Sequence, residues 1–100
     1  EMTVIMLCAK DGRRLIPVEG ARNIYYRCPC FYRENRSDGE KPCNMRMSLI
    51  RSDMVKQDAR NKYANGELKT GKMYICGHIA YRVARISEDY ITIYVRRTQS

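Results

Sequence analysis

The most constraining feature of the chain is the spacing of its cysteines and of its one histidine. Cys28 and Cys30 flank a single proline, Cys43 follows a polar loop, and Cys76 lies two positions before His78. A structural zinc site needs four tetrahedral ligands, usually thiolates and imidazoles, and closely spaced pairs often supply them. We therefore expect a structural zinc ion (Zn2+) bound by Cys28, Cys30 and Cys43, completed by Cys76, His78 or both.

Two other interpretations of the cysteines stay open. Unpaired cysteine is among the most buried residue types, so the sulfurs could be scattered through a hydrophobic core. Alternatively, Cys28 or Cys30 could form a disulfide with Cys43 or Cys76, and one thiol would remain because the chain has five cysteines. Cys8 stands inside an apolar run, and we expect it to be a core residue outside the metal site.

Length and composition fit one small domain that a bound metal would help to stabilise. The chain has 100 residues, which leaves little room beyond a single domain spanning residues 1–100. Hydrophobic residues make up 44% of it, enough for a modest core. The aromatic residues are eight tyrosines and one phenylalanine. Because tyrosine carries a polar hydroxyl, part of this aromatic surface is expected to face water or a ligand.

Hydrophobic patterning predicts a small mixed α+β domain that starts with a β-hairpin. Residues 3–9 are apolar on both alternating sets, which favours a buried strand. Lys10–Gly12 is a turn signal, and residues 13–18 are expected to form the returning strand. Pro17 pushes that strand toward the edge of a sheet. Residues 21–28 form a third candidate strand, which leads into the first cysteines.

One central amphipathic helix is expected after the cysteine-rich segment. Ser48 or Ser52 would cap its start, and Asn65–Gly66 would end it just after Ala64. Five apolar residues recur at helical spacing and should form its buried face: Ile50, Met54, Val55, Ala59 and Tyr63.

The C-terminal part of the chain predicts strands. Residues 72–76 are a candidate strand, while residues 78–86 and 90–97 alternate between apolar and polar side chains. The turn residues Ser87–Asp89 join the last two strands, so a C-terminal antiparallel hairpin is expected. In its last strand one face is apolar and the other is aromatic and basic, with Tyr90, Thr92, Tyr94 and Arg96.

The formal net charge of +8 favours an anionic partner. We expect nucleic acid, either RNA or DNA, with arginines contacting phosphates and tyrosines stacking on unpaired bases. The alternative is a regulatory module that binds an acidic protein surface, since tyrosine and arginine are also enriched at protein interfaces. A secreted, disulfide-linked ligand is a third interpretation. The candidate nucleic-acid-binding residues are Arg22, Tyr26, Arg27, Tyr32, Arg33, Arg36, Arg82, Tyr94, Arg96 and Arg97.

Two short segments resemble known families. The segment YYRC, ending at Cys28, is similar to the zinc-binding sheet of plant WRKY-type and FLYWCH-type DNA-binding domains, where a tyrosine-rich strand leads to the first ligand cysteine. That resemblance implies Cys43 as the second ligand and His78 as a later one, although the WRKY heptad is absent. The segment YRCPC is also similar to the cysteine entry of CXC chemokines, but here the expected helix precedes the last strands.

The sequence carries no pattern for catalysis or membrane insertion. It contains neither a glycine-rich phosphate loop nor a nucleophile elbow, so we expect a protein that is not an enzyme. No apolar run approaches the roughly 20 residues that cross a bilayer. The odd number of cysteines favours a reducing intracellular compartment, cytoplasm or nucleus, with secretion as the alternative.

Overall fold

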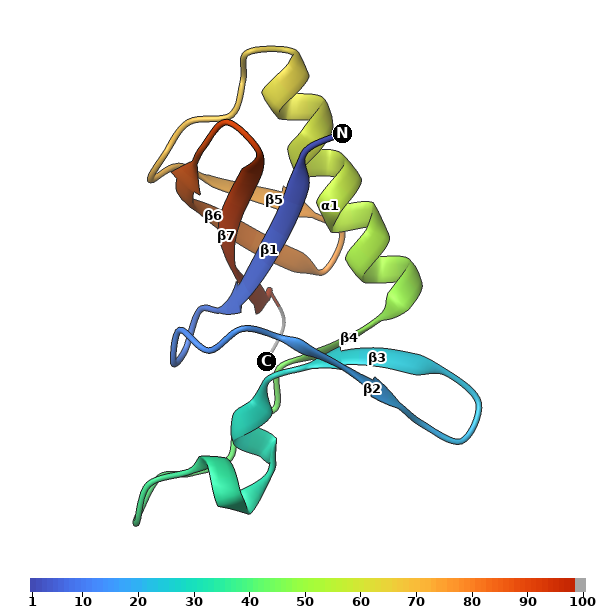
Figure 1. Ribbon diagram of the computed structural model, residues 1–100, viewed down its shortest axis with the longest axis vertical. Coiled ribbons are helices and arrows are strands. Elements are labelled where there is room, and N and C mark those ends of the chain that lie inside the picture. Colours follow the sequence, from blue (N-terminus) through green and yellow to red (C-terminus); the bar gives the residue numbers. More distant parts are fainter. Residues whose placement is uncertain (99–100) are drawn as a thin grey trace.

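The chain folds into two β-sheets and one α-helix, which confirms the predicted α+β class. A computed structural model describes residues 1–98, and in Figure 1 sheet A and the helix lie above sheet B. Sheet A contains, in spatial order, β1 (Thr3–Cys8), β7 (Tyr90–Arg97), β6 (Ile79–Ile86) and β5 (Met73–Cys76). Sheet B contains β2 (Ile16–Glu19), β3 (Ile24–Arg27) and β4 (Arg46–Ser48). The helices are α1 (Leu49–Ala64) and two short 3-10 turns, η1 (Pro29–Phe31) and η2 (Arg33–Asn35).

Sheet A brings the first strand of the chain next to the last one. β1 runs parallel to β7, with Thr3 opposite Tyr90 and Cys8 opposite Val95. β6 is antiparallel to both β7 and β5, so the predicted C-terminal hairpin is confirmed. Because side chains alternate across each strand, one face of sheet A is apolar and covered by α1. We call the opposite face the outer face.

The predicted N-terminal hairpin extends over only a few residues. Leu15 donates its amide to the Met6 carbonyl oxygen at 3.0 Å, and Cys8 donates to Arg13 at 2.7 Å. The chain then leaves sheet A, and β2 pairs with β3 in sheet B. Pro17 lies on β2, which is an edge strand of sheet B, as expected for a residue that lacks a backbone N–H group.

Helix α1 begins and ends where its capping residues predict. Ser48 is the N-cap, and its Oγ accepts the amide of Arg51 at 3.1 Å. The helix ends at Ala64, just before Gly66, whose φ of 74° suits a glycine after a helix.

The buried face of α1 is narrower than the sequence predicts. Val55 and Ala59 are fully buried as expected, together with Ser52. In contrast, Ile50 is 74% exposed, and Met54 and Tyr63 are also exposed, so the prediction for these three residues is wrong. The side chains that α1 buries are all small, and its larger apolar side chains lie outside that contact.

The core between α1 and sheet A contains one buried polar link. The Tyr81 ring is fully buried, and its hydroxyl donates to Asp58 of α1 at 2.6 Å. Lys62 also donates to Asp58, at 2.8 Å. Burial raises the pKa of Tyr81 above its ordinary value, and the hydrogen bond to Asp58 raises it further.

Among the helices of residues 1–98, none combines the length and the apolar character needed to cross a membrane.

Candidate metal centre and basic surfaces

Four cysteines converge where the end of β1 meets the loop between β3 and β4. Cys8 is the last residue of β1, Cys28 follows β3, Cys30 lies in η1, and Cys43 precedes β4. All four are buried. The Sγ atoms of Cys8 and Cys43 are 3.5 Å apart, and those of Cys28 and Cys30 are 3.4 Å apart. All five cysteines of the chain are free thiols.

The sulfur spacing matches what a single metal ion requires. Cys8, Cys28 and Cys43 place their Sγ atoms within 4.8 Å of one another, and Cys28 also forms a group of the same size with Cys30 and Asp11. Zinc–sulfur bonds of about 2.3 Å in a tetrahedron would separate neighbouring sulfurs by about 3.8 Å. The four cysteines lie close together and could hold a metal ion, with Cys28 common to both groups.

Backbone amides donate hydrogen bonds to two of these four sulfurs. The backbone amide of Cys43 donates to the Sγ of Cys30 at 3.0 Å, and the amide of Met45 donates to the Sγ of Cys43 at 3.4 Å. Such hydrogen bonds stabilise and orient a thiolate ligand. Pro29 begins η1, where its fixed φ suits the tight turn between Cys28 and Cys30.

Ion pairs of Arg13 with two carboxylates connect the loop of residues 28–45, which we call the metal loop, to the turn after β1. Arg13 donates to Asp11 at 3.0 Å and to Glu40 at 2.9 Å, and it also reaches the carbonyl oxygen of Asn35 at 2.7 Å. Burial by itself raises the pKa of Asp11, but hydrogen bonds from Arg13 and from the thiols of Cys28 and Cys30 lower it to about 2. The hydrogen bonds from Arg13 also lower the pKa of Glu40, so both carboxylates are ionised near neutral pH.

Without a metal, the buried thiols are protonated. Burial raises the pKa values of Cys28, Cys30 and Cys43 above that of a free thiol. The Cys28 thiol accordingly donates to Asp11 at 3.1 Å. A metal ion must displace these protons as it binds, so its affinity is expected to depend on pH.

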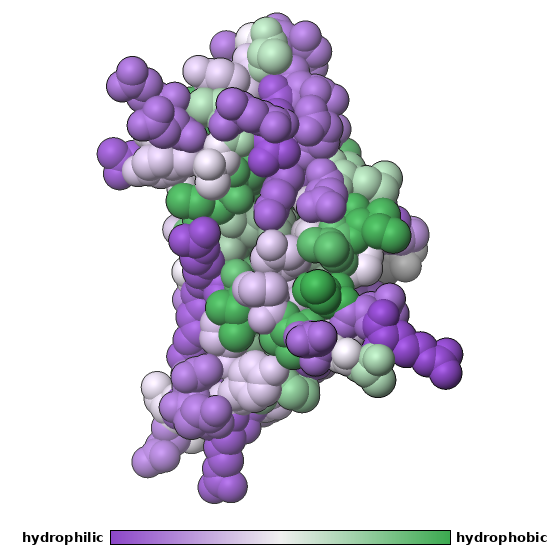
Figure 2. Space-filling model, turned by 45° about the vertical axis from the view of Figure 1, so that its right-hand side comes forward, coloured by the Kyte–Doolittle hydropathy of each residue, from purple (hydrophilic) through white to green (hydrophobic). Residues whose placement is uncertain are grey.

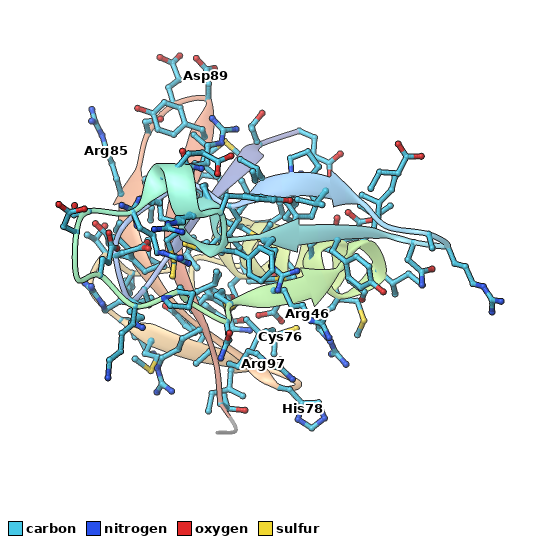
Figure 3. The ribbon with its side chains drawn as sticks, turned by 90° about the horizontal axis from the view of Figure 1, so that it is seen from below. Arg46, Cys76, His78, Arg85, Asp89 and Arg97 are labelled. Atoms are coloured by element: carbon cyan, nitrogen blue, oxygen red, sulfur yellow. The ribbon has the colours of Figure 1, made fainter. Side chains whose placement is uncertain are left out.

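Cys76 and His78 do not join the cluster, which corrects the predicted ligand set. Cys76 ends β5 on the side of sheet A that faces α1, and burial followed by the nearby Asp58 raises the pKa of its thiol. His78 is exposed in the turn between β5 and β6. Figure 3 shows both residues toward the same edge of the molecule in a view from below, and His78 lines a pocket with Arg46 and Arg97.

Cys8 takes the place in the cluster that the sequence assigned to Cys76 or His78. The prediction that Cys8 is a buried core residue is confirmed, at 2% exposed, and its sulfur also lies in a group with those of Cys28 and Cys43 that could hold a metal ion. Its position at the last residue of a strand, just before a turn, was the one local signal available. The pairing of the end of β1 with the metal loop is a long-range contact that no local pattern encodes.

Three of the predicted nucleic-acid-binding residues share the outer face of sheet A. The Arg82 guanidinium lies 4.9 Å from the centroid of the Tyr94 ring, and these residues are opposite each other on β6 and β7. Arg96 is on the same face, at the next outward position of β7. Arg97 points to the other side, toward the start of α1, where it lines a pocket with Arg46.

Three other predicted residues are engaged inside the fold. Tyr26 lies under α1, where the Lys56 ammonium is 4.8 Å from the centroid of its ring. The Arg27 guanidinium is 3.5 Å from the centroid of the Phe31 ring. Arg36 donates to two carbonyl oxygens of η1, both at 3.2 Å. These side chains support the metal loop and sheet B.

The remaining predicted residues lie at the periphery. Arg22 is exposed at the tip of the β2–β3 hairpin, and Arg33 is exposed in η2. Tyr32 packs edge-on against Phe31, with ring centroids 5.4 Å apart. The sequence did not predict that Arg85 belongs to the outer face, because simple alternation puts it on the same face as buried Val83.

A β-bulge changes that orientation. The pairing register shifts between Val83 and Arg85, so that Arg85 lies opposite Thr92 on the outer face. The outer face consequently carries three arginines, Arg82, Arg85 and Arg96.

No family model, no curated protein and no solved structure matches this chain.

Proposed function

We propose that the chain is a zinc-stabilised, non-enzymatic domain that binds single-stranded nucleic acid across the outer face of sheet A. The observation that carries this proposal is one in-register row on that face. Leu7, Tyr94, Arg82 and Met73 follow one another across β1, β7, β6 and β5. The row places the half-buried Tyr94 ring beside the exposed Arg82 guanidinium on the outer face, which is an arrangement that suits an unpaired base and its phosphate.

Charge on the outer face supports a nucleic-acid partner. Arg85 and Arg96 flank the row, and each keeps an exposed side chain. Stacking on an aromatic ring contributes about 1–3 kcal/mol per base and tolerates any sequence. Arginine adds charge-assisted hydrogen bonds to phosphate oxygens. We expect affinity with little sequence preference from this combination.

Zinc is the metal that the ligand set favours. Four thiolates suit a closed tetrahedral site, which is typical of structural zinc. Such an ion would fix the loop of η1 and η2 to the end of β1, leaving sheet A to bind the partner. Free thiols throughout the chain fit a reducing compartment, and we propose an intracellular location.

An acidic protein surface is the second candidate partner, and exposed apolar residues favour it. Met73 and Ile75, on the edge strand β5, are 47% and 67% exposed. Figure 2, in which the side of the molecule that carries α1 is turned forward, shows further hydrophobic residues between hydrophilic ends. A protein that adds a strand to β5 and presents acidic side chains would use both the edge and the arginines.

The two candidates are separated by anisotropy titrations of labelled single-stranded RNA, single-stranded DNA and duplexes of each. We expect tight binding of single strands, with affinity that falls steeply as salt rises because several phosphates are neutralised. Tyr94→Ala should weaken binding about tenfold or more through lost stacking. Lys41→Gln is the matched control, because it removes one positive charge from an exposed loop position outside sheet A.

Three outcomes would reject nucleic acid as the partner. The first is undetectable binding at low salt. The second is a salt slope no steeper than about one phosphate contact gives. The third is a loss of affinity in Tyr94→Ala no greater than that in Lys41→Gln, which would mean that the Tyr94 ring contributes no stacking.

A further inference from the structure

A basic pocket lies where the start of α1 meets β4 and the end of β7. Its volume is about 240 Å³, and its lining includes Tyr25, Arg46, Ser48, Arg51, His78 and Arg97. These residues come from both sheets, from α1 and from the turn between β5 and β6. Among residues 1–98, no carboxylate lines the pocket. Figure 3, a view from below, shows Arg46, His78 and Arg97 toward the same edge of the molecule.

The three arginines of the pocket have no counter-charge in the described part of the chain. Within residues 1–98 the ion pairs of arginine involve Arg13 and Arg60, and none involves Arg46, Arg51 or Arg97. Like charges held close together destabilise a fold unless an anion joins them. The grouping is therefore unfavourable for the free protein and favourable for an anionic complex.

Two of these arginines lie against neighbouring residues. The Arg46 guanidinium lies 5.6 Å from the centroid of the Tyr25 ring. The Arg51 guanidinium fills the space beside Gly77, so that a Cβ atom at Gly77 would collide with it. A side chain at Gly77 is also disfavoured by the φ of 61° at this position. Positioning before the ligand arrives lowers the entropy cost of binding.

We infer that this pocket binds a phosphate group, and that the group belongs to the nucleic acid when the strand lies on sheet A. The lining offers hydrogen-bond donors from guanidinium, hydroxyl and imidazole groups, which match the acceptor oxygens of phosphate. Arginine binds phosphate in a bidentate manner. The inference does not depend on the end of the helix, because Ser48 already accepts the Arg51 amide.

A continuous basic path links the outer face to this pocket. Arg96 belongs to the outer face, and Arg97, its neighbour in the chain, lines the phosphate pocket. Both arginines also line a larger adjoining cavity of about 480 Å³ together with Lys10. A strand that stacks on Tyr94 can follow this path around the end of β7. This inference rests on the proposed function for the source of the phosphate, although the pocket itself is defined independently of it.

The test is an NMR titration of the whole protein that follows the ring signals of His78, the one histidine of the chain. The probes are inorganic phosphate alone, a single-stranded oligonucleotide and the same oligonucleotide with a 5′-phosphate. The variants are Arg51→Gln and Arg97→Gln, with Lys41→Gln as the matched loss of charge. Far-UV circular dichroism and melting of each variant report whether it folds, and Arg97→Lys keeps the charge while removing the bidentate donor.

We expect phosphate and both oligonucleotides to shift the His78 signals in the wild type and in Lys41→Gln. Arg51→Gln and Arg97→Gln should lose the phosphate-induced shift. They should also bind the oligonucleotides about tenfold more weakly and lower the salt slope by about one. Arg97→Lys should recover the salt slope but only part of the affinity.

The outcomes separate the pocket from the proposed function. Phosphate-induced shifts without oligonucleotide binding would support the pocket and overturn the nucleic-acid proposal. Oligonucleotide binding that depends on Tyr94 but not on Arg51 or Arg97, with His78 unmoved, would overturn the pocket and leave the proposed function intact. A His78 signal that no probe moves would likewise overturn the pocket.

Discussion

Replacing Cys8 by serine tests the corrected ligand set directly. If Cys8 is only a core residue, Cys8→Ser puts a hydroxyl into a site that is 2% exposed, at a cost of about 1–3 kcal/mol. If it is a metal ligand, the variant loses much of a metal-binding free energy that is on the order of 10 kcal/mol in small sites. Small domains have total stabilities of about 5–15 kcal/mol. The second case therefore predicts an unfolded or metal-free chain.

The assay combines the metal content of the purified protein with thermal melting in the presence and absence of a chelator. Wild type should contain about one zinc ion per chain and lose its cooperative melt on chelation. Cys8→Ser should lose both the zinc and the response to the chelator. Cys76→Ser is the matched control, since Cys76 is partly buried but lies outside the cluster, and it should retain the ion.

A reversed pattern would refute this reasoning. If Cys8→Ser keeps one zinc while Cys76→Ser loses it, the fourth ligand is Cys76, one of the two residues that the sequence suggested. A wild-type protein that contains no metal and melts identically with chelator would remove the metal centre altogether. Substitution with Co2+ adds a separate readout, because its absorption spectrum reports how many thiolates bind the ion.

Two further predictions concern the fold around α1. Tyr81→Phe removes the hydroxyl that donates to Asp58 at 2.6 Å, and urea unfolding should show a loss of about 1.5–3 kcal/mol. Because the folded pKa of Tyr81 is raised, the unfolded state ionises first, so its contribution to stability is complete below about pH 10 and is lost at higher pH. Tyr81→Phe should accordingly reduce the alkaline slope of the unfolding free energy by up to about 1.4 kcal/mol per pH unit, and an unchanged slope would contradict the assigned environment. Gly77→Ala should cost more than Gly12→Ala in thermal melts, since both have positive φ but only Gly77 lies against Arg51, and equal costs would show that the Arg51 side chain moves away freely.

The local elements were predictable because their signals are local. Ser48 and Gly66 mark the ends of α1, and the alternation of residues 90–97 gives the last strand and its two faces. Pro17 correctly predicts an edge strand. Fold class follows from these pieces, since each depends on propensities and turn residues within a few positions.

The site was only partly predictable because its closure depends on contacts between distant segments. Cys28, Cys30 and Cys43 lie in one loop, and their spacing together with Cys76 and His78 suggested a metal. Cys8 reaches that loop because β1 enters sheet A beside β7, a parallel pairing that no sequence pattern specifies. The bulge that turns Arg85 outward and the exposure of Ile50 also depend on tertiary packing.

The parallel pairing of β1 with β7 has a consequence for how this chain folds. The residues that pair with Thr3–Cys8 are Tyr90–Val95, so β1 has no partner on that side of sheet A until residue 95 has been synthesised. Contacts of such long sequence separation form slowly. Apolar strands are also prone to aggregate as long as their partner strand is not available for pairing. Because the metal loop ends well before β7, an ion held by Cys8 and that loop would anchor β1 before its partner strand arrives.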